Sequence, residues 1–386
     1  MVHQTMNTKI SSAPRASRAR SSMGWWARGG LAAILGSLAA CSSPPLQAPP
    51  AAAPMPRASA ARWAAVDWRD LPGWGSSDDL LAAWPALLAN CQRPAPGWAE
   101  FCARAAQQAP ADATEATLFL MKHLRPWRLA ADGGEATGLL TGYFEPQLVA
   151  SRVRQGVFQW PLLALPADPA LRRLPRRDSD ADPRFAALAY LDDPFALLQL
   201  QVQGSGRLVM RDANGGAERV SRVAFAGHND QPFQSVVRAL LERGEVGDAT
   251  PPSLRDWARR NPGRVRDALA VNPRVVYFRE EALADASQGP RGAQGLPLVP
   301  GRSVAVDRAV IGLGTPLWLD STEPWSPGAA AAPLRRLVLA QDTGGAIQGA
   351  VRADLFWGWG DDAALRAGRT KQPLRLWALL PQGLTP

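Results

Sequence analysis

Two aspartates in a glycine-rich stretch are the strongest candidates for chemistry in this sequence of 386 residues. Asp342 follows an apolar run of strand character, and Asp354 comes twelve residues later, ahead of an aromatic-rich run. The glycines around them are Gly344, Gly345, Gly349, Gly358 and Gly360. Glycine allows positive φ values and close backbone approach but weakens regular helices and strands. Five glycines in so short a stretch therefore indicate turns with a specific backbone geometry that serves a function. Two carboxyl groups set among such turns are suited to general acid–base catalysis.

An aspartate that acts as a general acid needs an unusual environment. Its pKa must rise from about 3.9 by roughly three units, equal to about 4 kcal/mol, through burial or a neighbouring like charge. Phe356, Trp357 and Trp359 adjoin Asp354 and predict an apolar wall beside it, and Asp342 would tune it or supply a hydrogen bond. The alternative is that both aspartates cap turns at a glycine-rich barrel corner. The fifteen tryptophans of the chain slightly favour a sugar ligand, since aromatic faces stack on pyranose rings.

Several other chemistries lack their sequence patterns. Beyond residue 40 the chain has two histidines, His123 and His228, which are far apart and without metal-ligand spacing. There is no Gly-x-Ser-x-Gly elbow, phosphate-binding loop or dinucleotide fingerprint. The run Gly204-Ser205-Gly206 precedes a strand-like segment and predicts either a tight hairpin or backbone that binds substrate. We therefore expect neither a metal nor an organic cofactor.

The N-terminal residues have the pattern of a lipoprotein signal. Five basic and no acidic residues precede an apolar run over residues 31–40, which is too short for a permanent membrane span. Small residues then lead to Cys41, the predicted lipidation site, although an ordinary signal peptide that happens to meet a cysteine is the alternative. Translation could also start at Met23. Ser42 and Ser43, rather than an aspartate, favour the outer membrane over the inner one.

Composition and charge describe the remainder of the chain. Residues 41–62 are rich in Pro and Ala and predict a disordered tether, because such a segment buries too little apolar surface to offset its ordering entropy. Removing five basic residues from the formal charge of +9 leaves +4, which argues against nucleic acid and suits an anionic polymer. Cys91 and Cys102 can form a disulfide or remain two buried thiols.

Apolar periodicity predicts a mostly β protein with a few peripheral helices. One helix follows the capping residues 76–79, and a second covers about 111–124 with Leu118, Leu120 and Met121 on one side. A third begins at Asp230 as cap, with Pro232 in its first turn and Phe233, Val236, Val237, Leu240 and Leu241 as its buried stripe. Strands are predicted at 139–144, 198–203, 207–210, 275–278, 303–306, 337–340 and 374–379. Strict alternation over 198–203 places three glutamines on one face of that strand. Short strands between Gly and Pro turns indicate barrels.

Several motifs in order resemble one family, the membrane-bound lytic murein transglycosylase A family. The matching blocks span about residues 139–379: Thr141 to Pro146, Val202 to Gly206, Phe225 to Asn229, Asn272-Pro273, Pro297 to Asp307, and Asp342 to Gly368. Agreement of several blocks in order is a stronger signal than any single Gly-x-Gly. The sequence departs from the family pattern after Asn229, where Asp230 stands in place of the usual glycine. That departure affects the expected conformation of this loop.

The resemblance implies a fold and a mechanism. The fold is a double-psi β-barrel from residues 63–147 and 281–386, with a second β-barrel, residues 148–280, inserted into it and a glycan groove between the two. Asp354 matches the family's single acid–base aspartate, and Asp342 matches its other prominent one. The implied reaction cleaves the β-1,4 bond from N-acetylmuramic acid to N-acetylglucosamine with a 1,6-anhydromuramyl product. The residues expected to contact substrate are Tyr143, Gln203, Gly204, Ser205, Gly206, Thr343, Gly344, Gly358 and Gly360.

The expected setting is the periplasmic face of a Gram-negative outer membrane, with the chain anchored through lipidated Cys41. Its expected partners are peptidoglycan glycan strands and, where these exist, cell-wall synthesis or division complexes. Two alternative functions fit the same residues. One is a hydrolytic muramidase that uses Asp354 and Asp342 as a pair, since glycoside hydrolases usually need two carboxylates. The other is a lipoprotein that binds peptidoglycan without enzymatic activity.

Overall fold

The computed structural model describes residues 61–386 except 181, 211–218, 284 and 325–330. The predicted signal of residues 1–40, the lipidation site Cys41 and almost all of the tether therefore lie outside the described residues. Within the described ranges, no helix combines the length and the apolar character that a membrane crossing requires. Strands dominate the described chain and form two sheets, so the predicted mostly β class is confirmed.

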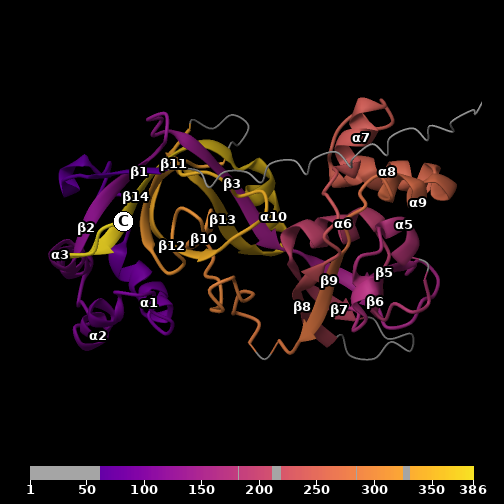
Figure 1. The fold of residues 1–386 in the computed structure, drawn as a ribbon, viewed down its shortest axis with the longest axis horizontal. Helices are drawn as coiled ribbons and strands as arrows, with labels where there is room; N and C mark the ends of the chain where they lie inside the picture. Colours follow the sequence, from indigo (N-terminus) through magenta and orange to yellow (C-terminus); the bar gives the residue numbers. More distant parts are fainter. Residues whose placement is uncertain (1–60, 181, 211–218, 284, 325–330) are drawn as a thin grey trace, which may run out of the picture. The chain divides into compact units, whose positions relative to one another are not determined.

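The first sheet is a closed barrel with two extra strands at one edge. Its order is β1-β2-β14-β11-β12-β10-β13-β3, and β14 also pairs with β3, which closes the six strands from β14 to β3 into a barrel. The strands are β1 (Ala61–Ala65), β2 (Leu124–Ala131), β3 (Gly138–Glu145), β10 (Ser303–Val306), β11 (Pro316–Thr322), β12 (Pro333–Asp342), β13 (Arg352–Trp359) and β14 (Lys371–Pro381). Figure 1 shows purple β3 beside orange and yellow strands, so both ends of the described chain build one barrel.

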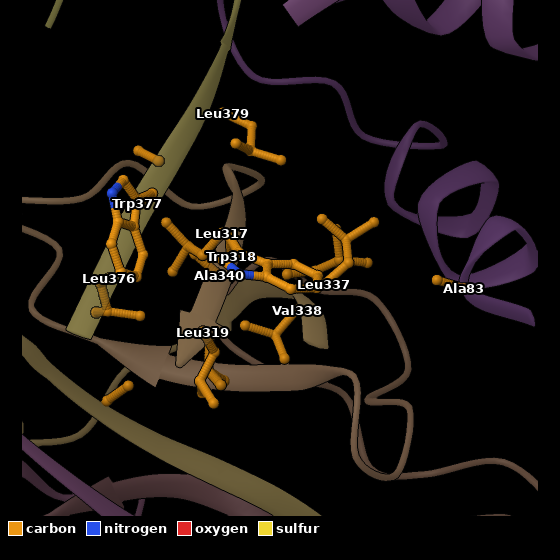
Figure 2. Close-up of a cluster of buried hydrophobic side chains, with 14 of the residues drawn as sticks. Ala83, Leu317, Trp318, Leu319, Leu337, Val338, Ala340, Leu376, Trp377 and Leu379 are labelled. Atoms are coloured by element: carbon orange, nitrogen blue, oxygen red, sulfur yellow. The ribbon is translucent and has the colours of Figure 1, made fainter. Parts of the chain in front are cut away.

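The barrel is held by a large apolar core. Trp318 is fully buried and packs with side chains of β11, β12 and β14, and its indole nitrogen donates a hydrogen bond to the Pro72 carbonyl at 3.1 Å. Figure 2 shows these side chains in one cluster, with Ala83 of helix α1 (Leu80–Asn90) at its edge. Each fully buried Leu or Val side chain contributes about 1.5–3 kcal/mol. This packing gives the strands that carry the two aspartates a rigid base.

The second sheet has six strands in the order β5-β6-β4-β7-β8-β9. They are β4 (Gln147–Ser151), β5 (Trp160–Leu163), β6 (Ala187–Leu191), β7 (Ser205–Met210), β8 (Arg219–His228) and β9 (Val276–Glu281). A single bridge from Ala164 to Phe278 brings the outer strands β5 and β9 together. Around the sheet lie helices α4 (Pro169–Arg172), α5 (Arg176–Ser179), α6 (Pro194–Gln203), α7 (Val236–Glu242), α8 (Pro251–Arg260) and α9 (Val265–Leu269).

A buried ion cluster joins the two sheets. Glu145 ends β3 and is completely buried, and its two carboxylate oxygens accept hydrogen bonds from Arg207 of β7 at 2.8 Å and Arg222 of β8 at 2.6 Å. The Arg207 guanidinium also lies 4.0 Å from the ring centre of Trp359, at the end of β13. Both arginines donate further hydrogen bonds to the carbonyl of Gln288. The second sheet is thereby tied to the two barrel strands nearest the site.

The predicted strand at 198–203 was wrong, because these residues form the C-terminal part of α6. Asp193 caps this helix by accepting from the backbone N–H groups of Phe195 and Ala196, and Pro194 occupies its first turn. Gly204 ends it in a left-handed conformation with φ 79°. Gly204-Ser205-Gly206 is therefore a helix-to-strand turn and not a hairpin. The alternation of Leu and Gln resembled a strand, but Leu197 and Leu200 lie three residues apart on one helical face and are buried.

The third predicted helix begins later than expected. Helix α7 starts after Ser235, whose hydroxyl accepts from the Arg238 N–H, so Asp230 is not the cap. Asp230 instead adopts φ 58°, and it alone has a positive φ among the described non-glycine residues. This value suits the position where the family resemblance predicts glycine, because aspartate tolerates the left-handed region better than most residues. Phe233 lies outside the helix and is 53% exposed, and Leu241 is also exposed, so neither belongs to a buried stripe.

The N-terminal helices pack against the barrel. Asp79 caps α1 as predicted, and Asp78 pairs with Arg302 at 2.5 Å, which ties the helix to the barrel. The second predicted helix is α3 (Ala113–His123), but it buries Ala116, Phe119 and Leu120 and leaves Leu118 59% exposed. Helix α2 (Ala99–Gln107) was not predicted. Cys91 and Cys102 form a disulfide between α1 and α2, which resolves the alternative left open by the sequence.

Candidate active site

The barrel register brings the two aspartates to one face of the sheet. Strand β10 lies between β12 and β13, and its Ala305 pairs with Asp342 on one side and with Asp354 on the other. Asp354 in turn pairs with Thr141 of β3. Directly paired residues project to the same face, and neighbouring strands lie about 4.8 Å apart, so the aspartate Cα atoms are roughly 10 Å apart. The carboxyl groups therefore belong to one site although a strand separates their backbones.

Asp354 lies in a partly buried setting with one side-chain donor. The Thr141 hydroxyl donates a hydrogen bond to its carboxyl at 2.6 Å. Burial raises the pKa of Asp354, and the charge of Asp342 raises it further, while the Thr141 hydrogen bond and the Arg352 guanidinium act in the opposite direction. Burial is the largest of these effects. The environment thus favours a protonated Asp354, which is the state that a general acid requires.

Asp342 is better equipped to hold a negative charge. Its carboxyl accepts the Tyr143 hydroxyl at 2.9 Å, the Ala293 N–H at 3.0 Å and the Thr343 N–H at 2.9 Å. Burial raises the pKa of Asp342, and all three hydrogen bonds oppose that rise. The pKa of Tyr143 is raised by burial and by the Asp342 charge, so its phenol remains a donor. Because three donors face Asp342 and one faces Asp354, we infer that a proton shared by the site resides on Asp354.

The predicted aromatic wall is only partly present. Phe356 is fully buried and packs against Tyr143 with ring centres 5.2 Å apart, on the strand face that also carries Asp354. Trp357 points to the other face of β13, where its indole N–H donates to the Thr370 hydroxyl at 2.9 Å. Trp359 stacks under Arg207. Of the three residues, Phe356 alone belongs to the aspartate site.

Two glycines show why small residues recur here. A Cβ atom on Gly142 would lie 2.6 Å from the Trp357 indole nitrogen, so no larger residue fits between Thr141 and Tyr143. Gly358 has φ 105°, a conformation that residues with side chains rarely adopt, and it lies within a register irregularity in the pairing of β13 with β3. Both glycines therefore serve the strand geometry that places Thr141, Tyr143 and Asp354.

A cavity of about 1210 Å³ opens beside the site. Among the residues predicted to contact substrate, those that line it are Tyr143, Gln203, Gly204, Ser205, Thr343 and Gly344, and the predicted catalytic residue Asp342 lines it as well. Gly206, Gly358, Gly360 and Asp354 are not among its lining residues. Asp354 is partly exposed, and the cavity reaches the site through Tyr143 and Asp342. The Gln203 side chain accepts the Phe144 N–H at 3.1 Å, so the part of the cavity lining around Gln203 is fixed to β3.

Thr141 and Ala293 were not predicted as site residues. Thr141 could have been found, because period-two alternation in β3 places it on the same face as Tyr143. Ala293 acts through its backbone N–H and leaves no side-chain signal in the sequence. His123 and His228 are not near each other: His123 packs on Phe119, and His228 contacts Asp230. Across the described residues, no cluster of three or more His, Cys, Asp or Glu side chains could hold a metal ion.

Fold and site together define a β-barrel protein with a pair of carboxyl groups beside a wide cavity. Two family models match the chain, the MltA specific insert domain over residues 139–279 and the 3D domain over residues 302–380. The chain is 33% identical over 264 residues to membrane-bound lytic murein transglycosylase A of Vibrio cholerae, covering 64% of this chain and 67% of that protein. The chain therefore belongs to the membrane-bound lytic murein transglycosylase A family.

Two solved structures support this assignment. The lytic transglycosylase LtgG of Burkholderia pseudomallei has 43% sequence identity and a TM-score of 0.59, covering 85% of this chain and 97% of that chain. MltA of Escherichia coli with bound chitohexaose has 25% identity and a TM-score of 0.64, covering 83% of this chain and 94% of that chain. The predicted barrel fold is thus found in this family.

Proposed function

We propose that this chain is a lytic murein transglycosylase that cleaves the β-1,4 bond between N-acetylmuramic acid and N-acetylglucosamine in peptidoglycan. The observation that carries the proposal is the unequal pair of carboxyl groups, with Asp354 disposed to hold a proton and Asp342 disposed to hold a charge. The family's named activity supports it. A relative with bound chitohexaose supports a glycan ligand.

Asp354 is the proposed acid and base of the reaction. As an acid it gives its proton to the glycosidic oxygen, and the bond from that oxygen to the muramyl C1 breaks. Its carboxylate then takes the proton of the muramyl C6 hydroxyl, whose oxygen bonds to C1 and forms the 1,6-anhydro ring. No water needs activation, so one carboxyl group serves both steps. Asp342 contributes through its charge, which helps to keep Asp354 protonated before the reaction.

The groove wall is proposed to include the cavity residues around Tyr143 and Gln203. Tyr143 is held by Asp342, and Gln203 is held by the backbone of Phe144, so both side chains are fixed before substrate arrives. Ser205, Thr343 and the flanking Gly204 and Gly344 offer polar atoms and open backbone near them. Gly206 is buried against Leu200 and would support this wall from behind. Gly358 and Gly360 shape the turn after Asp354. We assign the barrel domain to residues 63–147 and 281–386 and the inserted domain to residues 148–280.

A hydrolytic muramidase is the second candidate, because two carboxyl groups share one face of the sheet. The products distinguish the two functions. Purified protein would be incubated with peptidoglycan sacculi, and the released muropeptides identified by mass spectrometry before and after borohydride reduction. Anhydromuropeptides that resist reduction are expected. Reducible ends would instead establish the hydrolase.

Asp354→Asn tests the assignment of the acid, and Asp361→Asn is its matched control, since Asp361 is exposed at the start of helix α10 (Gly360–Arg369). The first variant should release no anhydro product while remaining folded, and the second should be as active as the unmodified protein. Glycan binding without any product from the unmodified protein would instead favour a non-enzymatic lipoprotein.

We further propose that the protein is an outer-membrane lipoprotein that faces the periplasm and is anchored by lipidated Cys41. The basic and apolar N-terminal pattern supports this location, as does the description of its relatives as membrane-bound. Cys41→Ala should shift the protein from the membrane fraction to the soluble fraction and remove the acyl mass from its N-terminal peptide. Retention of the variant in the membrane fraction would contradict the anchor.

A further inference from the structure

Three exposed apolar side chains from the predicted inserted domain line the cavity. Val202 is 64% exposed, Phe225 47% and Phe233 53%, and all three line the cavity. They come from α6, β8 and the segment before α7, so the fold brings together three separate parts of the chain. Apolar side chains that gather at a cavity wall while remaining exposed commonly mark a binding surface.

This apolar surface adjoins the proposed glycan wall. Val202 directly precedes Gln203, and the Phe225 Cβ lies 4.0 Å from the position that a Cβ on Gly204 would occupy. The same cavity reaches Asp342 and Tyr143 on the barrel side. Val202 and Phe225 therefore lie directly beside the residues proposed for the glycan wall.

The cavity lining also carries uncompensated positive charge. Arg255 is paired with Asp193, and Arg279 with Glu281. Arg274 donates to the Gln231 carbonyl at 2.7 Å and, in the part of the chain that the structure describes, has no carboxylate within ion-pair distance. Arg274 is close to Phe233 in the structure, because the Asn272 side chain accepts the backbone N–H groups of both Gln234 and Arg274. The apolar surface thus has a cation at its Phe233 end.

The chemistry of peptidoglycan suggests what this surface binds. Its glycan backbone is uncharged where the lactyl group of muramic acid is amide-linked to a peptide, so the negative charges of a strand are the carboxylates of its peptide stems. The stems also carry alanine methyl groups. A surface with phenyl rings and an unpaired guanidinium complements such a stem better than it complements an uncharged sugar.

We propose that the surface formed by Val202, Phe225, Phe233 and Arg274, here called the stem surface, binds the peptide stem of peptidoglycan. The inference rests on the proposed function for its substrate. It deepens that function by assigning the inserted domain a second recognition task, in which the sugar is held near Asp342 and the stem is held on the stem surface. The enzyme should then favour glycan strands that retain their stems.

The test compares two substrates and two variants, one at Phe233 in the stem surface and one at Leu118 outside it. Initial rates would be measured on glycan strands with tetrapeptide stems and on the same strands after an amidase has removed the stems. Phe233→Ser should lower kcat/KM on stem-bearing strands about fivefold, as expected for losing a half-buried phenyl contact. It should leave the rate on stripped strands unchanged. Leu118→Ser is the matched control, because Leu118 is similarly exposed on α3 and does not line the cavity.

Charge is tested separately at Arg274. Arg274→Gln should reduce kcat/KM on stem-bearing strands, and Arg274→Lys should restore most of it, because lysine keeps the charge. An equal loss on both substrates would show that the surface is a glycan subsite, and no loss on either would show that it binds nothing in the reaction. Either outcome would overturn the proposal.

Binding of the free tetrapeptide stem, measured by calorimetry with the full-length protein, separates this proposal from the proposed function. Binding should weaken in Phe233→Ser and with rising salt, but not in Leu118→Ser. If the protein binds the stem but releases no anhydro product from any substrate, the proposed function fails and the stem surface stands. If anhydro product forms but the free stem does not bind and stem-bearing strands are not preferred, the stem surface fails alone.

Discussion

Thr141→Val is the most direct test of the proposed proton on Asp354. The Thr141 hydroxyl is the only side-chain donor that the described residues offer to the Asp354 carboxyl, at 2.6 Å. Valine has nearly the shape of threonine and the same preference for strands, so β3 should form as before. The substitution therefore removes one hydrogen bond and little else.

The expected effect follows from the sign and size of that hydrogen bond. Burial raises the pKa of Asp354 and the Thr141 hydrogen bond opposes this, so removing the bond raises the pKa further. A hydrogen bond to a charged group contributes about 1.5–3 kcal/mol. At about 1.4 kcal/mol per pH unit, the alkaline limb of the kcat/KM profile should move upward by roughly one to two pH units. Activity falls along this limb because the general acid loses its proton.

The assay is the rate of anhydromuropeptide release from sacculi between about pH 4 and 9, taken at substrate concentrations far below KM. Asp342→Asn provides a comparison of opposite sign, since removing the like charge lowers the pKa of Asp354 and should move the limb to lower pH. A folded Thr141→Val protein with an unmoved alkaline limb would refute the assignment of Asp354 as the titrating acid. Complete loss of activity in Asp342→Asn would favour the two-carboxylate hydrolase.

Three further predictions concern stability. Asp354→Asn should raise the melting temperature at pH 7 by about 2 °C, because burial raises the folded-state pKa of Asp354 and makes its ionised form unfavourable in the folded protein. The unmodified protein loses stability as the pH rises through that pKa, so the two melting temperatures should agree below about pH 4. An equal gain at all pH values would contradict this explanation. Glu145→Gln should cost about 3–5 kcal/mol in denaturant unfolding, because it leaves two buried guanidinium groups without their carboxylate; a cost below about 1 kcal/mol would show that the cluster does not hold the sheets together. Cys91→Ala with Cys102→Ala should cost about 3 kcal/mol by the loop-entropy argument, and reductant should then no longer change the melting temperature.

Local patterns in the sequence were enough for most of the barrel. The predicted strands at 303–306 and 337–340 fall on β10 and within β12, because continuous apolar runs of this length suit strands buried on both faces. The alternation at 198–203 led to a wrong prediction, because a segment of only six residues can match the two-residue period of a strand by chance while forming a helix with a period of 3.6 residues. Asp193, Pro194 and Gly204 around it are helix start and stop signals, and they were the better evidence.

The site could be predicted only in part. The glycine-rich stretch identified Asp342 and Asp354, but their joint position depends on β10 lying between β12 and β13. Nothing local in the sequence specifies that pairing, since β10 is parallel to one neighbour and antiparallel to the other. The Ala293 amide is beyond sequence reasoning for a different reason, because every residue except proline has such a donor.

The proposed reaction requires one carboxyl group, Asp354, to serve as both acid and base. Burial and the Asp342 charge disfavour ionised Asp354, so it gives up its proton only when the glycosidic oxygen gains basicity as its bond to C1 breaks. The carboxylate left behind is partly buried, near a second negative charge and supported by the single hydroxyl of Thr141. It therefore regains a proton readily, and the nearest acidic hydrogen in the proposed reaction is on the muramyl C6 hydroxyl. The raised pKa of Asp354 thus suits both proposed roles, because it keeps the carboxyl group protonated in the resting site and makes its carboxylate a better base in the second step. A second hydrogen-bond donor at Asp354 would lower this pKa and so oppose both roles.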